Sequence, residues 1–165
     1  VSTLSPQTVI TRGIMVDVET AGPDPVQHAL LSIGACVINN WRNSFYVELR
    51  PDSRRFEQAA MEVHQLELDR LDRYGISPRT ALRRFVDWVV VRRTRPLFVA
   101  HNAAFDWMFV QIYLRRYNIK NPFGHWPFDT KSAYGNIMTS PLPHLARQDA
   151  QIQTQDLHRY YRTLR

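Results

Sequence analysis

Two acidic residues, Asp17 and Glu19, end an apolar run that begins at Gly13. Alternate side chains of a strand share a face, so these carboxylates would point the same way, about 7 Å apart along the chain. A cation between them would relieve their repulsion, and carboxylate oxygens are suitable ligands for Mg²⁺ or Mn²⁺. The alternative is a strand that ends in solvent with both acids hydrated, because so short a pattern often occurs by chance.

A third acid, Asp106, follows the short apolar run 96–100 and falls in the first turn of a helix expected over 104–117. The helix dipole favours a carboxylate at this place, and that alone could explain the residue. A catalytic role requires Asp106 to lie beside the ends of the first and fourth strands. A strand-to-helix junction of this kind is a common ligand site in α/β proteins.

The last candidates are His144 and Asp149, which follow Pro141 and Pro143. Five helical residues turn by about 500°, so the two side chains cannot share a face if both are helical. The prolines favour His144 in the loop or the first turn, and Asp149 borders an apolar stripe, so we expect it to face inward and need a partner. A histidine there could act as a general base; the alternative is a surface or capping histidine.

Hydrophobic patterning predicts the elements that position these groups. Strands are expected over 13–18, 29–38, 44–49 and 96–100. Helices are expected as short pieces within 55–74, over 79–92 and 104–117, from Asp129, and from about Pro143 to Tyr161. We therefore predict an α/β fold of ribonuclease H-like order, a mixed sheet flanked by helices whose first three strands are antiparallel and whose later strands are parallel.

Length and composition bound the organisation of the chain. At 165 residues we expect a single domain over 1–165, with residues 1–12 as a loose polar lead-in. The net charge of +6 and the pI near 9.9 favour polyanionic partners. The single cysteine, Cys36, excludes an intramolecular disulfide. There is no apolar run long enough for a membrane span and no leader pattern, so we expect a soluble, cytoplasmic protein without membrane association.

The three groups read Asp17-x-Glu19, Asn102-Ala103-x-Phe105-Asp106 and His144-x-Ala146-x-x-Asp149. In order and spacing they resemble the motifs of the DEDDh 3′-5′ exonucleases, the family of ribonuclease T, oligoribonuclease and the proofreading epsilon subunit of DNA polymerase III. Residues 17–22 are similar to the family's first motif, D-x-E-T-T-G. The resemblance covers nearly the whole chain.

The resemblance implies a metal-dependent hydrolase. Asp17, Glu19, Asp106 and Asp149 would hold two Mg²⁺ or Mn²⁺ ions, and His144 would deprotonate the attacking water. The substrate would be the 3′ end of single-stranded RNA or DNA, and the product a nucleoside 5′-monophosphate. The resemblance also leaves a homodimer open.

Further residues are expected to border the terminal nucleotide: Thr20, Ala21, Gly22, Asn102 and Trp107. Ala21 replaces the family's second threonine, which removes a hydroxyl contact and leaves the substrate preference open. Trp107 stands beside Asp106 and could stack on a base, although aromatic residues of this kind more often belong to a core.

Two other functions remain open at this point. A non-catalytic nucleic-acid-binding or polymerase-partner module on the same fold would bind without cleaving. An unrelated carboxylate-cluster endonuclease would release oligonucleotides, but the histidine and aspartate of the third motif do not belong to that class.

Overall fold

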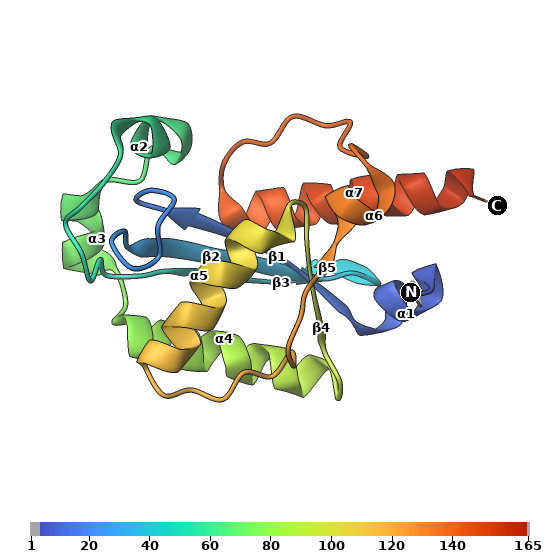
Figure 1. Cartoon of the computed structure of the whole chain (residues 1–165), viewed down its shortest axis with the longest axis horizontal. Helices are drawn as coiled ribbons and strands as arrows, with labels where there is room; N and C mark the ends of the chain where they lie inside the picture. Colours follow the sequence, from blue (N-terminus) through green and yellow to red (C-terminus); the bar gives the residue numbers. More distant parts are fainter. Residues whose placement is uncertain (1–3, 165) are drawn as a thin grey trace.

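A five-stranded mixed sheet of order β3-β2-β1-β4-β5 organises the computed structural model, which describes residues 4–164 (Figure 1). The strands are β1 (Gly13–Thr20), β2 (Leu30–Val37), β3 (Asn40–Glu48), β4 (Leu97–Ala100) and β5 (Phe128–Asp129). β1, β2 and β3 pair antiparallel, while β4 joins β1 and β5 joins β4 in parallel. The predicted mixed sheet, antiparallel first and parallel later, is confirmed.

Helices cover both faces of this sheet. They are α1 (Pro6–Arg12), α2 (Gln58–His64), α3 (Leu68–Tyr74), α4 (Pro78–Arg92), α5 (Ala103–Arg116), α6 (Thr130–Tyr134) and α7 (Ala146–Thr163). α4 and α5 lie on one face and α7 on the other (Figure 1). None of the helices in residues 4–164 is long and apolar enough to cross a membrane.

The alternation of β1 divides its side chains between the two faces. Ile14, Val16 and Val18 pack in the core under α4 and α5, whereas Met15 packs in the core under α7. Asp17 and Glu19 continue the second series, so period-two alternation directs both acids towards α7. The sequence indicates that the two acids share one face of β1, and the structure shows that α7 covers that face.

Several expected boundaries differ from the structure, including the start of β3, which lies at Asn40 rather than at 44. Residues 1–12 are not a loose lead-in throughout, because α1 begins at Pro6, with the Ser5 side chain accepting a hydrogen bond from the Thr8 amide and Val9 buried. Residues 1–3 lie outside the described part. The last helix begins at Ala146 rather than near Pro143, since His144 has a left-handed φ of 56° that ends any helical path through it.

The start of α7 packs directly on the backbone of β2. A Cβ atom placed on Gly34 would lie 2.0 Å from the carbonyl carbon of Ala146, so no larger residue fits there without moving the helix. Gly34 is also the strand partner of Asp17. The missing side chain therefore allows the first turn of α7 to approach the acidic part of β1 closely.

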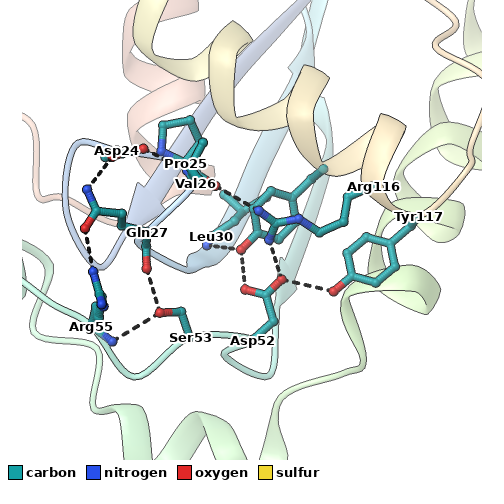
Figure 2. A network of polar contacts seen from close by, with 11 residues as sticks. Asp24, Pro25, Val26, Gln27, Leu30, Asp52, Ser53, Arg55, Arg116 and Tyr117 are labelled. Carbon is teal, nitrogen blue, oxygen red and sulfur yellow. Dashed lines mark hydrogen bonds and ion pairs between the residues drawn. The ribbon is translucent and has the colours of Figure 1, made fainter.

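A polar network holds the loop between β1 and β2 (Figure 2). The carboxylate of Asp52 accepts hydrogen bonds from the hydroxyl of Tyr113 at 2.5 Å, from Arg116 at 2.8 Å and from the hydroxyl of Tyr117 at 3.0 Å. The Tyr113 hydroxyl in turn accepts one from the Leu30 amide at 2.8 Å. One end of this loop is thus tied to α5 and to the segment after β3.

The other end of the network secures the outer part of the loop. Gln27 donates to Asp24, and Arg55 donates to the side chain of Gln27 (Figure 2). The Ser53 hydroxyl donates to the Gln27 carbonyl at 2.6 Å. The segment after β1 is therefore fixed from two sides.

Replacing Tyr113 with Phe tests the network. The change leaves the buried Leu30 amide without an acceptor, and we expect it to lower the free energy of unfolding by about 1–3 kcal/mol in urea denaturation. Tyr117→Phe is the matched control, because it removes one exposed hydrogen bond and should cost less than about 1 kcal/mol. Equal losses in the two variants would contradict the role given to the Tyr113 hydroxyl.

Candidate active site

Three carboxylates meet between β1 and α7. One oxygen from each of Asp17, Glu19 and Asp149 lies within 4.8 Å of the others. Asp149, in the first turn of α7, is 2% exposed, and Glu19 is 9% exposed. Asp149 faces inward, as its border position on the apolar stripe predicts. The structure thus brings together residues that are more than 100 positions apart in the sequence.

Asp106 lies next to this group but outside it. Its side chain is 6% exposed, and its Oδ1 accepts a hydrogen bond from the Val18 amide at 3.0 Å. β1 pairs with β4 only as far as Met15, so the later amides on that edge of β1 have no strand partner. Asp106, in the first turn of α5, accepts the hydrogen bond that a further strand residue would otherwise accept at Val18. It therefore lies beside the end of β1, as a catalytic role requires.

Burial and mutual repulsion raise the pKa values of these acids. Burial and then the charge of Asp149 raise the pKa of Asp17 to about 8, although a hydrogen bond from Gln153 lowers it. Burial, then Asp17 and Asp149, raise the pKa of Glu19 to about 9. Burial followed by the charge of Asp17 holds the pKa of Asp106 well above its ordinary value, and burial raises that of Asp149. Without a cation, the group therefore retains protons at neutral pH.

The donor atoms fit a hard divalent cation. The group offers carboxylate oxygens alone, which are the ligands that Mg²⁺ and Mn²⁺ prefer over sulfur or imidazole. Oδ1 of Asp149 is buried, and it has no hydrogen-bond partner among the described residues. A buried carboxylate oxygen without a donor is costly, and a cation would satisfy it.

His144 lies near this group, just before the start of α7. It is exposed, and it immediately precedes Leu145, the N-cap residue of α7. Burial raises the pKa of Asp149, and the neighbouring His144 offsets part of that rise; burial lowers the pKa of His64, and His144 lowers it further. The side chain is therefore close to the carboxylates and open to solvent, the arrangement that a proton acceptor needs.

Three of the residues expected to border a nucleotide are buried. The Thr20 hydroxyl donates to the Gly22 carbonyl at 2.9 Å, and Ala21 is 0% exposed. Gly22 packs against the ring of His28, where a Cβ atom would lie 2.7 Å from the ring. These three residues form the buried end of β1 and the start of the loop after it, and their contact with a nucleotide stays a prediction.

The other two lie around α5. Asn102 is the exposed N-cap residue of α5, with a left-handed φ of 69°, and its amide donates to Asp129 at 2.9 Å. This turn redirects the chain from β4 into α5. Trp107 is half-buried and packs edge to face on Phe98 at 5.1 Å, so core packing accounts for its side chain.

Two residues of the site escape the sequence analysis. His64 is buried; its Nδ1 accepts from the Leu66 amide, so its Nε2 carries the proton that bonds the Thr20 carbonyl at 3.0 Å. Gln153 is 2% exposed and donates from Nε2 to Oδ1 of Asp17 at 2.8 Å. The available sequence signal for Gln153 is a polar residue one helical turn after Asp149, on the inward face of the last helix.

The chain matches known exonucleases in sequence. The family model described as "Exonuclease" and named for RNase T matches residues 14–159. The 3′-5′ DNA exonuclease Cap18 of Escherichia coli is 43% identical over 127 residues, covering 75% of this chain and 68% of that protein. Ribonuclease T of Haemophilus influenzae strain PittGG is 32% identical over 161 residues, covering 84% of this chain and 67% of the relative.

Solved structures share the fold at low sequence identity. The nuclease domain of 3′hExo, a DEDDh family member bound to rAMP, matches with a TM-score of 0.73, 13% identity and 92% coverage of both chains. S. pombe Pop2p, in a form with Mg²⁺ and Mn²⁺ bound, matches with a TM-score of 0.66 and 10% identity, over 93% of this chain and 84% of that one. On its sequence matches this chain belongs to the RNase T exonuclease family, and its fold is the ribonuclease H-like fold of DEDDh nucleases.

Proposed function

We propose that this protein removes nucleoside 5′-monophosphates one at a time from the 3′ end of single-stranded nucleic acid, in a reaction that requires Mg²⁺ or Mn²⁺. The observation that carries the proposal is the group of three carboxylates, Asp17, Glu19 and Asp149, which each place one oxygen within 4.8 Å of the others, with Asp106 beside them. The named activities of the relatives support it, since one is a 3′-5′ DNA exonuclease and another a ribonuclease T. The choice between DNA and RNA is left to experiment.

The four acids would hold two divalent cations. Asp17, Glu19 and Asp149 form the carboxylate group, and Asp106 joins them from the first turn of α5. When bound, the cations supply positive charge that stabilises the attacking and leaving oxygens of the phosphodiester. Asp106 reaches this position with one oxygen already held by the Val18 amide, so its second oxygen remains to act as a ligand.

His144 would take the proton from the attacking water. The water oxygen bonds to phosphorus, the bond from phosphorus to the 3′ oxygen of the preceding nucleotide breaks, and that oxygen regains a proton as a hydroxyl group. Because His144 is exposed, the proton it accepts can pass to solvent between turnovers.

The charge distribution favours a polyanionic substrate. Arg12, Arg92, Arg93 and Arg95 line a hollow at the end of β1 opposite the carboxylates. A second hollow beside Trp41 contains Arg159 and Arg162. These arginines attract the phosphates of a nucleic acid. The four acids of the site repel a phosphate until bound cations neutralise their charge. A homodimer stays a prediction.

The proposed activity predicts a single-nucleotide ladder from 5′-labelled single-stranded RNA or DNA, present with Mg²⁺ or Mn²⁺ and absent with EDTA. Asp106→Asn should reduce the rate by at least about 100-fold, the scale of losing one group that stabilises transition-state charge. Asp87→Asn, an exposed aspartate on α4, is the matched control and should leave the rate unchanged. Binding without cleavage would favour the non-catalytic module, and oligonucleotide products would favour an endonuclease.

Replacing His144 with Asn should lower kcat by about 10²–10⁴-fold, the usual contribution of a positioned general base. Metal binding should persist, seen as an unchanged increase of Tm on adding Mg²⁺, because the imidazole is not among the grouped carboxylates. His125→Asn, at an exposed loop position, serves as the control. A His144→Asn enzyme of normal rate would exclude the histidine as the base.

The pH dependence of stability should reveal the buried acids. Their pKa values in the folded protein, about 8 for Asp17 and about 9 for Glu19, exceed the ordinary 3.8 and 4.5. Between about pH 4 and 8 the unfolded chain has lost protons that the folded, metal-free protein retains, so the stability must fall as pH rises, by on the order of 1 kcal/mol per pH unit.

Urea unfolding between pH 5 and 9 measures this slope. We expect a steep decline in EDTA and a flatter one in Mg²⁺, because the cation replaces the protons. Glu19→Gln removes one of the two groups and should flatten the decline in EDTA. An equal dependence of stability on pH in the wild-type protein and in Glu19→Gln, both in EDTA, would show that the acids are ionised without metal, because a group ionised in both the folded and the unfolded state contributes no slope.

A further inference from the structure

Gln153 occupies an unusual place beside the acidic group. It lies one helical turn after Asp149 on α7, and its side chain is 2% exposed. Its Nε2 donates to Oδ1 of Asp17 at 2.8 Å. Of the three grouped carboxylates, Asp17 is the one that receives a hydrogen bond from another side chain within residues 4–164. α7 therefore contacts β1 at two successive turns, first with an acid and then with a neutral donor.

The other end of the same amide has no partner. Oε1 of Gln153 is buried and makes no hydrogen bond with any described residue. A buried acceptor without a donor destabilises the fold. Methionine or leucine would fill much of the same space without that cost, so packing alone does not explain an amide here. The hydrogen bond to Asp17 is the interaction that does.

We propose that Gln153 is a positioning residue, which holds one oxygen of Asp17 so that the other is presented to the bound divalent cations. The inference rests on the proposed function only in that Asp17 is taken as a metal ligand. A carboxylate beside two like charges would otherwise turn away from them, and a neutral donor can hold it without adding charge. Outer hydrogen bonds of this kind commonly contribute 10–100-fold in metal affinity.

The residue that orients Asp17 lies on the same helix as Asp149. Asp149 and Gln153 share one helix face, so a single rigid element both supplies a ligand and orients the ligand on β1. Any shift of α7 along β2 would move the two together. The close packing of Ala146 on Gly34 opposes such a shift.

Calorimetric titration with Mg²⁺ and with Mn²⁺ tests this role without substrate. Gln153→Met retains the length of the side chain and removes the donor, and we expect Kd for the metal to rise by about 10-fold or more. Gln151→Met is the matched control on the same helix, since Gln151 donates to the Trp41 carbonyl at 3.1 Å, away from the acids. Its Kd should stay within about twofold of wild type.

Activity supplies an independent readout. For Gln153→Met, the metal concentration that gives half-maximal rate should rise in proportion to Kd, while the rate at saturating metal returns to within a few-fold of wild type. A residue that only stabilised the fold would instead lower Tm in EDTA and leave the metal affinity unchanged. Gln153→Leu, a smaller apolar replacement, repeats the test if the methionine variant does not fold.

The outcomes separate the two proposals. If the wild-type protein binds metal but cleaves no nucleic acid, the proposed function fails, whereas a weakened metal affinity of Gln153→Met still supports the positioning role. If the wild-type protein cleaves and Gln153→Met or Gln153→Leu binds metal as tightly as wild type, the positioning role is overturned and the exonuclease is not.

Discussion

Repulsion between buried carboxylates is the constraint on which the rest of this structure depends. Asp17, Glu19 and Asp149 lie within 4.8 Å of one another in a largely buried place, where like charges interact far more strongly than in water. The unfavourable free energy of bringing these acids together must be offset by favourable packing in other parts of the fold. Two apolar clusters, one on each face of the sheet, supply it, and the acids lie at the end of the strand that contributes to both.

The elements around the acids hold them in place by close contacts. α7 can approach β1 because Gly34 leaves no side chain between them, and α5 approaches the free edge of β1 where pairing with β4 has ended. The Asp106 side chain then completes the hydrogen bonding of β1 at Val18. The acids are thus fixed by backbone packing and by edge contacts, and within residues 4–164 none of the four forms an ion pair with a lysine or arginine that a cation would have to displace.

The sequence predicts the parts of this arrangement that arise from local periodicity. Alternation shows that Asp17 and Glu19 share a face, and the apolar stripe of the last helix indicates that Asp149 faces inward. The strand order also follows, because short loops favour antiparallel neighbours and helical crossovers favour parallel ones. The roles given to the candidate residues rest on family resemblance and on the proposals above.

Other features could not be predicted because they depend on contacts between distant segments. The bond of Gln153 to Asp17 joins residues 136 positions apart. Helical spacing from Asp149 places this glutamine on the inward face, but no local pattern indicates which residue of β1 it meets. The turn of Asp106 towards the Val18 amide depends on where β4 stops pairing. α1 was missed because seven residues with one buried side chain give too weak a periodic signal.

The buried position of the acids and the exposed position of His144 agree with the different tasks that the proposed function gives them. A ligand for a hard cation gains from burial, since a low dielectric strengthens its attraction to the ion. A base must release its proton between turnovers, and a buried imidazole would have no route for it. The left-handed turn at His144 reconciles these needs, because it lets the chain pass from an exposed position to the inward-facing Asp149 within five residues. The interruption of the helix at its entry is therefore what would let one short segment supply both the ligand and the base of the proposed mechanism.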